Sequence, residues 1–132
     1  MTGERDLEKL LASMSPELMD GEYVYCTFQD AQYGDFSDLA PVAVISESEG
    51  LTLIIPKSKA DEKNIAYGSA FKGITLSIHS SLDAVGLTAA FSSKLTEHGI
   101  SANVIAGYYH DHIFVQSDFA ARAMEALNQF AR

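Results

Sequence analysis

The sequence predicts an α+β protein made of two similar units in tandem, and three observations support this prediction. First, apolar runs on either side of a short polar turn occur twice, at 42–56 and 102–116, as is typical of β-hairpins. Second, a helix-forming segment follows each hairpin. Third, a strand-like apolar run stands before each hairpin, at 23–28 and at 74–80. The two halves repeat the same order of secondary-structure elements, not the same residues.

The first half opens with an amphipathic helix over residues 4–13, which a Ser-Pro pair ends. The segment 29–40 is polar, and we expect a loop there with at most one helical turn. A short polar helix is predicted near 57–64, after a proline. The residues at helical spacing that support the first helix are Leu7, Leu10, Leu11 and Met14.

The second half carries a longer helix, expected from about residue 84 to residue 98. Its apolar stripe is formed by Leu87, Phe91 and Leu95, which recur at intervals of four. Gly99 follows at the place where a left-handed residue commonly ends a helix. A final helix follows the second hairpin, with Ser117 or Asp118 as its expected cap and Ala120, Met124, Leu127 and Ala131 as its inner face.

This order of elements is that of the ferredoxin-like β-α-β-β-α-β unit, with antiparallel sheets and helices on one face. We expect an N-terminal helix over 1–15, a first unit over 16–71 and a second over 72–132. The second unit ends in its last helix, so no fourth strand follows it. Because an open sheet edge exposes unpaired backbone groups, the first unit or a second subunit is expected to complete the sheet. A homodimer is therefore predicted.

Composition excludes several classes of partner. The 132 residues include 18 acidic and 9 basic ones, for a net charge of −9, whereas nucleic-acid binders carry basic stripes. No apolar run approaches the roughly 18 residues that a membrane span needs. The charged N-terminus does not resemble a secretory signal, and the single cysteine, Cys26, forms no intrachain disulfide. We expect a cytoplasmic protein with neither nucleic acid nor membrane as partner.

Three stretches of the second half together carry a resemblance to a known family. They read Ser-Ser-Leu-Asp-Ala-Val-Gly-Leu-Thr-Ala-Ala at 80–90, Gly-Ile-Ser-Ala-Asn-Val-Ile-Ala-Gly-Tyr-Tyr at 99–109, and His-Asp-His-Ile-Phe-Val at 110–115. This unit resembles an ACT domain, the small ligand-sensing module of amino-acid metabolism. The whole chain is similar to small stand-alone bacterial ACT-domain proteins whose biochemical role is not established. In the first half, Glu-Ser-Glu-Gly-Leu-Thr-Leu-Ile at 47–54 resembles a diverged ACT half.

The resemblance implies a pocket for a small effector, most often an amino acid, at an interface between two domains. The turn before the helix and the start of the following strand would form that pocket. The family's Asp-Arg-Pro-Gly style of turn corresponds here to Asp83-Ala84-Val85-Gly86, without the proline. The implied ligand-binding residues are Leu82, Asp83, Ala84, Val85, Gly86 and Leu87 in the turn, and Ala102, Asn103, Val104 and Ile105 in the strand.

The residue types suit an amino acid. Free N–H groups at a helix start attract a carboxylate, and Gly86 lets a ligand approach the backbone. Asn103 offers donors and an acceptor, and Asp83 can pair with an ammonium group. Structural roles are the alternatives: Asp83 as an N-cap in competition with neighbouring serines, Gly86 in helix–sheet packing, and Asn103 in a turn.

His110-Asp111-His112 is the main competing feature. Two histidines separated by one residue can share a metal, with Asp111 or His79 as a further ligand. A structural metal site needs about four ligands, so the alternative is a turn stabilised by Asp111 with His112 packed at a sheet face. A metal- or protein-binding module that uses the His110–His112 hairpin or the sheet surface is the second reading of function.

Catalysis is not expected. His79 and Ser80 are neighbours on a strand, so their side chains point to opposite faces and form no nucleophile–base pair. Cys26 stands in an apolar strand and reads as a packed core thiol. No glycine-rich phosphate loop is present, and we expect no cofactor. The sequence thus predicts a non-enzymatic binding protein whose effector is a small molecule, an amino acid above all.

Overall fold

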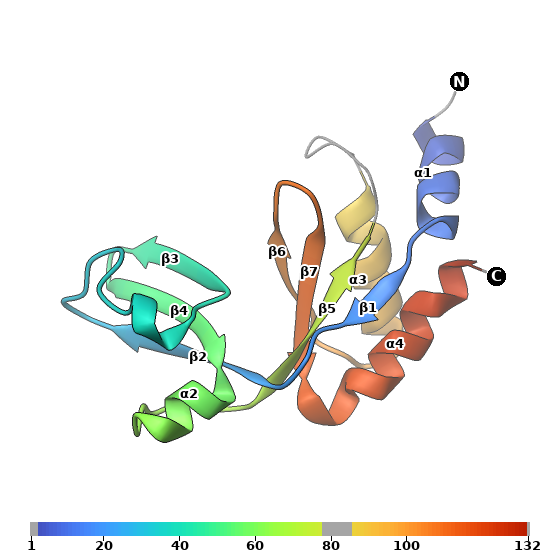
Figure 1. The fold of residues 1–132 in the computed structure, drawn as a ribbon. Helices are drawn as coiled ribbons and strands as arrows, with labels where there is room; N and C mark the ends of the chain where they lie inside the picture. Colours follow the sequence, from blue (N-terminus) through green and yellow to red (C-terminus); the bar gives the residue numbers. More distant parts are fainter. Residues whose placement is uncertain (1–2, 78–85, 132) are drawn as a thin grey trace. The chain divides into compact units, whose positions relative to one another are not determined.

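The computed structural model describes residues 3–77 and 86–131 and divides into two compact units (Figure 1). The composite unit contains Met1–Asp20 and Lys72–Arg132, and the central unit contains Gly21–Phe71. The division predicted along the sequence, at 15 and 71, stays a prediction. The contacts assign the first 20 residues to the same compact unit as the C-terminal half.

The sheet of the composite unit is completed from within the chain. Strand β5 (Phe71–Leu76) lies next to β7 (Asp111–Gln116), and β7 pairs with β6 (Asn103–Ala106). On its other edge β5 pairs antiparallel with the short strand β1 (Pro16–Leu18). The expectation that the first half of the chain or a second subunit would supply a fourth strand is met by β1. The edge of β5 that β1 covers therefore gives no reason to expect a dimer.

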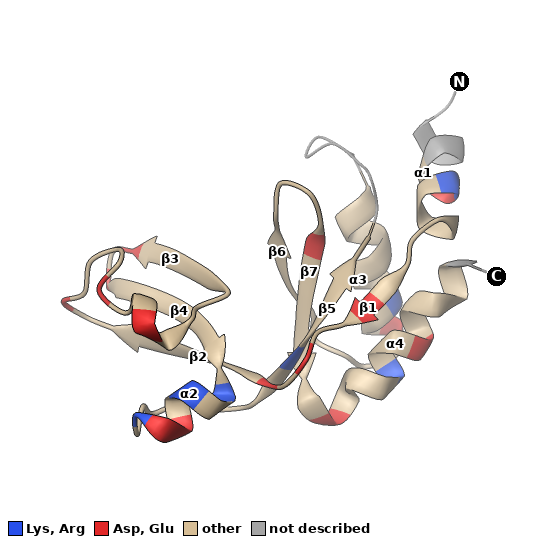
Figure 2. Ribbon diagram, viewed as in Figure 1, with Lys and Arg blue, Asp and Glu red and all other residues tan. Residues whose placement is uncertain are grey.

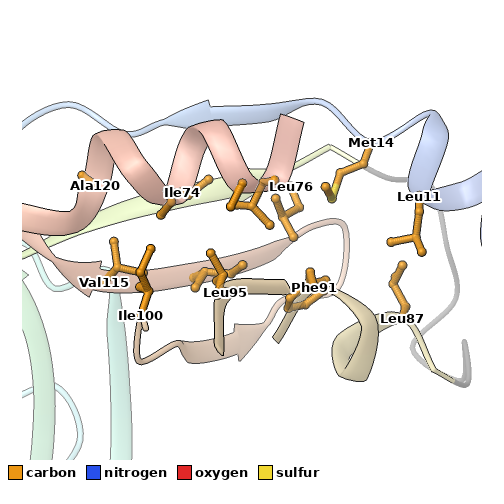
Figure 3. Close-up of a cluster of buried hydrophobic side chains, with 14 residues drawn as sticks. Leu11, Met14, Ile74, Leu76, Leu87, Phe91, Leu95, Ile100, Val115 and Ala120 are labelled. Atoms are coloured by element: carbon orange, nitrogen blue, oxygen red, sulfur yellow. The ribbon is translucent and has the colours of Figure 1, made fainter. Parts of the chain in front are cut away.

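Three helices pack on one face of this sheet: α1 (Gly3–Ala12), α3 (Leu87–Glu97) and α4 (Ala120–Asn128). Alternate residues of the strands face them, and Figure 3 shows these side chains meeting in one core. Burying each of the larger side chains contributes about 1.5–3 kcal/mol. Of these larger side chains, those at most 1 % exposed are Ile74, Leu76, Phe91, Leu95, Ile113, Val115 and Leu127.

The end of α3 confirms the expected glycine stop. His98 is the C-cap and its Nδ1 lies 3.0 Å from Lys94 O, at the negative end of the helix dipole. Gly99 follows with a φ of +71°. Its N–H donates to Thr96 O at 2.9 Å, and Ile100 N donates to Leu95 O at 3.0 Å. These two bonds form a Schellman motif.

The predicted starts of two helices differ from the structure. The α3 helix begins at Leu87 rather than near residue 84, and its N-cap is Gly86. The last helix, α4, follows a short 3₁₀ turn, η2 (Ser117–Phe119), and its N-cap is Phe119 with no side-chain capping bond. The prediction that Ser117 or Asp118 occupies the N-cap of this helix is therefore wrong, because the 3₁₀ turn takes up those residues first.

The central unit has three antiparallel strands in the order β3-β4-β2: β3 (Ala43–Glu47), β4 (Gly50–Pro56) and β2 (Tyr23–Phe28). Helix α2 (Lys57–Glu62) follows β4. The connection from β2 to β3 contains only the 3₁₀ turn η1 (Ser37–Leu39) where the ferredoxin-like pattern has a helix, as the polar sequence of this loop predicted. Its core consists of Val24, Cys26, Leu39, Leu51, Leu53, Ile55 and Ala60.

In the described part of the chain, charge is spread over both units and no large basic cluster forms (Figure 2). Figure 2 shows most Lys and Arg residues singly, except on α2, where they stand beside acidic ones. There Lys57 Nζ lies 3.0 Å from Asp61 Oδ2, so part of the local positive charge is paired. Among the helices of the described ranges, none combines the length and apolar character needed to cross a membrane.

Candidate functional site

The turn that the resemblance points to is described only from Gly86 onward, and Leu82 to Val85 lie outside the described residues. Gly86 is the N-cap of α3, with a φ of +87° and no side-chain capping bond. Its carbonyl accepts a hydrogen bond from Ala90 N at 2.9 Å. The first N–H groups of a helix have no partner within the helix, so the start of α3 has the electrostatics for binding a carboxylate.

Helix α1 packs close to this turn. A Cβ built on Gly86 would lie 3.3 Å from Leu7 Cδ2, so the side chain of α1 limits the space over the glycine. Leu87, the next residue, is 3 % exposed and belongs to the core. A ligand at the start of α3 can therefore meet the backbone of Leu87 but not its side chain. The sequence predicted the helix α1, but no pattern in it indicated that α1 would lie beside this turn.

The strand residues of the predicted site are divided between the two faces of the sheet. Val104 pairs with Ile113 and packs against the core under the helices. Asn103 and Ile105 alternate with it and lie on the helix-free face. The amide of Asn103 donates from Nδ2 to Phe114 O at 3.1 Å, which occupies one of its donors.

The two parts of the predicted site lie at different ends of the composite unit. Helix α3 has 11 residues, which at 1.5 Å per residue span about 16 Å between its two ends. Gly86 precedes its first residue, whereas Asn103 follows the Schellman turn at its last. In Figure 1 the closed end of the β6–β7 hairpin lies at the end of the unit where α3 begins, so β6 starts toward the opposite end. One composite unit does not bring Gly86 and Asn103 into a single pocket.

The closed end of the β6–β7 hairpin lies beside the His110-Asp111-His112 motif. Gly107 N donates to His110 O at 2.9 Å, and a Cβ on Gly107 would lie 2.8 Å from that oxygen, so the tight turn requires glycine. The rings of Tyr108 and Tyr109 are exposed and meet edge to face with centroids 5.1 Å apart. These tyrosines are available to a partner rather than to the core.

His112 lies on the helix-free face and contacts β5. Its Nδ1 is 3.0 Å from Thr75 Oγ1. Partial burial lowers the pKa of the His112 imidazole, and repulsion by His110 adds to this against the attraction of Asp111. Burial also raises the pKa of the Asp111 carboxyl, while His112 opposes that change. This shift favours the neutral form of His112. Its bond to Thr75 joins residues 37 positions apart, for which no local pattern gives a signal.

The described ranges contain no grouping of three or more His, Cys, Asp and Glu side chains that would hold a metal. His110 Nδ1 is buried and has no hydrogen-bond partner there. His79, the further ligand considered from the sequence, lies outside the described residues. The His110–His112 pair thus lacks a third ligand among the residues described.

Cys26 packs as the sequence predicted. The thiol is buried, and its Sγ donates a weak hydrogen bond to Leu53 O at 3.8 Å. Burial raises the pKa of this thiol, which disfavours the nucleophilic thiolate. The serines at 80 and 81, considered beside His79, lie outside the described residues.

Comparison with known families gives a match to each half of the chain. One ACT-domain model matches residues 2–72, and a second ACT-domain model matches residues 71–129. No curated protein sequence matches the chain.

Three solved structures are similar to the chain over most of its length. A protein of unknown function from Vibrio cholerae, described as a possible transport protein, is 54 % identical, with 99 % of this chain and 100 % of that chain covered and a TM-score of 0.91. A protein from Agrobacterium tumefaciens is 14 % identical, with 89 % of each chain covered and a TM-score of 0.72. The ligand-free regulatory subunit of aspartate kinase from Thermus thermophilus is 11 % identical, with coverages of 88 % and 94 % and a TM-score of 0.61. At such low identities the last two show the fold alone.

Proposed function

Because the chain belongs to the ACT-domain family, we propose that it is a regulatory protein that binds an amino acid and transmits this signal to a partner protein. ACT domains are regulatory rather than catalytic. The regulatory subunit of aspartate kinase has the same fold. An amino-acid effector, the residues that hold it and a cytoplasmic location are proposals for this chain.

The start of α3 is the observation that carries the proposal. Its N-cap is a glycine, and no side chain of the described residues caps it, which favours an anionic group at the first-turn N–H groups. A carboxylate placed there gains from the helix dipole, by about 0.3–1 kcal/mol at an exposed site. Asp83, three residues before Gly86 in the sequence, supplies the opposite charge for an ammonium group.

The proposed site is shared between two copies of the chain. Gly86 and Asn103 lie at different ends of one composite unit, so a pocket that uses both takes them from different units. A homodimer in which the β6 strand of one copy meets the α3 start of the other supplies this arrangement. Ile105, on the same face as Asn103, would then contribute apolar contact. Binding would shift the dimer equilibrium because the ligand has higher affinity for the paired state.

A thermal-shift and calorimetric screen against the twenty amino acids tests the proposal. A ligand at 100 times its Kd adds about 2.7 kcal/mol to the unfolding free energy. We expect one amino acid to bind, and Asp83→Ala and Asn103→Ala each to weaken it. Asp30→Ala is the matched control, because Asp30 is an exposed carboxylate of the central unit. Absence of binding by every amino acid, or equal loss in the control, would contradict the proposal.

A protein-binding role of the hairpin is the second candidate, and the exposed tyrosine pair at its closed end favours it. Tyrosines are enriched at protein interfaces because they bury a large apolar area and keep a polar end. Under this reading, Tyr108→Ser combined with Tyr109→Ser abolishes partner binding and leaves amino-acid affinity unchanged. The first reading predicts that Asp83→Ala reduces both amino-acid binding and its effect on the partner.

A further inference from the structure

A cavity lies in the central unit, on the side of its sheet where the loop from β2 to β3 passes. Its volume is about 270 Å³. Its floor consists of Val44, Leu51 and Leu53, which share one face of β3 and β4. The loop that covers it contains the three-residue turn η1 instead of a helix, which leaves room between loop and sheet. The remaining lining residues are Tyr33, Gly34, Phe36, Ser37 and Pro41.

The loop over the cavity is held in place by several contacts. Phe36 stacks on Phe28 of β2, with ring centroids 3.9 Å apart and an angle of 21°. Gln32 N donates to Asp35 Oδ2 at 2.7 Å, and Leu39, only 2 % exposed, anchors the end of the turn in the core. A cavity whose walls are ordered in this way requires little rearrangement to accept a ligand.

The lining determines which ligand fits. None of the lining residues is charged, and Leu51 and Leu53 are at most 2 % exposed. A carboxylate or ammonium group would lose its hydration there without gaining a partner. At the open side stand the phenol of Tyr33, which is 81 % exposed, and the hydroxyl of Ser37. These groups can hydrogen-bond to one uncharged polar atom of a ligand, while an apolar ring of the same ligand packs against the floor of the cavity.

We propose that this cavity binds a small uncharged aromatic molecule of about the size of indole. Apolar cavities of about 150 Å³ bind benzene, so a larger ring fits the volume available here. The ring lies against Val44, Leu51 and Leu53, under Phe36, and Tyr33 closes over its exposed edge. The site lies wholly within the central unit, and an amino-acid zwitterion does not suit it. It is therefore independent of the effector site proposed at α3.

Indole titration followed by methyl NMR tests this inference. We expect saturable shifts of the Val44, Leu51 and Leu53 methyl signals, together with nuclear Overhauser contacts from indole protons to them. Val44→Phe fills the cavity and is expected to weaken indole binding at least about tenfold, equivalent to about 1.4 kcal/mol. Ile45→Phe is the matched control, because it places the same aromatic side chain on the opposite face of β3, at a position that is 43 % exposed. This variant should bind indole like the unchanged protein.

The inference is overturned if indole produces no saturable shifts up to its solubility limit. It is also overturned if the contacts map to other residues, or if folded Val44→Phe binds indole like the control. If Val44→Phe does not fold, the contacts in the unchanged protein decide the matter alone. L-tryptophan separates the two sites, since its charged groups exclude it from this cavity. A response to L-tryptophan near Gly86 supports the effector site and leaves the indole result unaffected.

Discussion

His112 Nδ1 lies 3.0 Å from Thr75 Oγ1, and this pair joins β7 to β5 on the helix-free face of the composite unit. The contact places a titratable ring in a partly buried position between two strands of the sheet. His110 and Asp111 are the charged or titratable neighbours that act on it, with opposite effects. The face away from the helices therefore carries a group whose folded pKa lies below its ordinary value.

Acidification should destabilise the protein through His112. The folded pKa of this group is below its ordinary value of 6.5, so the unfolded chain binds the proton more readily. The stability that neutral His112 contributes is complete above pH 6.5 and falls as the pH decreases toward the folded pKa. One group gives a slope of at most about 1.4 kcal/mol per pH unit. Urea denaturation between pH 7 and pH 5 measures it. His112→Gln should reduce this slope. An unchanged slope would show that other groups cause the pH dependence.

Phe91→Ala should destabilise the protein strongly. The ring is fully buried in the core under α3, and its removal leaves a cavity. Such truncations cost about 3–5 kcal/mol. Thr88→Ala, at an exposed position on the same helix, should change the unfolding free energy by less than about 0.5 kcal/mol. Denaturant midpoints compare the two variants, and similar midpoints would contradict the assignment of Phe91 to the core.

Gly99→Ala should cost about 1–2 kcal/mol, since an alanine at a φ of +71° places its Cβ close to the backbone. Gly99→Asn should cost less, because asparagine tolerates this conformation. Gly68→Ala is the control: it has no positive φ and nothing within 4 Å of the added Cβ. Thermal unfolding ranks the three variants, and a loss in Gly68→Ala equal to that in Gly99→Ala would refute the conformational explanation.

Met19→Pro should weaken the join between the N-terminal segment and β5. Met19 N donates to Gly73 O at 2.8 Å, and proline has no N–H to donate. Leaving the buried Gly73 carbonyl unpaired costs about 1–3 kcal/mol. Met19→Leu keeps both the N–H and much of the side-chain volume and should be close to neutral. Amide hydrogen exchange of β5 reports the change, and full protection of β5 in Met19→Pro would contradict the role given to the Met19 hydrogen bond.

Elements with a strong local pattern were predictable. The strand expected over 23–28 is β2, and the helix expected over 84–98 is found at Leu87–Glu97. Gly99 ends that helix through bonds between residues at most five positions apart. Such elements depend on neighbours in the sequence, so the residue pattern contains most of the information that specifies them. The missing helix in the β2–β3 connection was predicted for the same reason.

The site could be predicted only in its parts. Gly86 and Asn103 each belong to a recognisable motif, but their separation depends on the direction in which α3 runs from the turn. The proximity of Leu7 to Gly86 and the bond of His112 to Thr75 bring together residues far apart in the sequence. The local sequence pattern around any one of these residues does not indicate which residue it will contact. The cavity of the central unit also arises from the way a loop passes over the sheet.

By itself the sequence determined the two-unit α+β plan and the apolar faces of its helices, because periodicity and turn chemistry act over a few residues, and its motifs carried the resemblance to the family. Only the tertiary structure decided that Pro16–Leu18, a segment too short to carry a pattern, forms the fourth strand of the C-terminal sheet. It also decided that Gly86 and Asn103 lie apart. The first outcome depends on a pairing between distant segments, whose energy comes from the assembled sheet and core rather than from local preference, and the second on the direction in which α3 runs over the sheet.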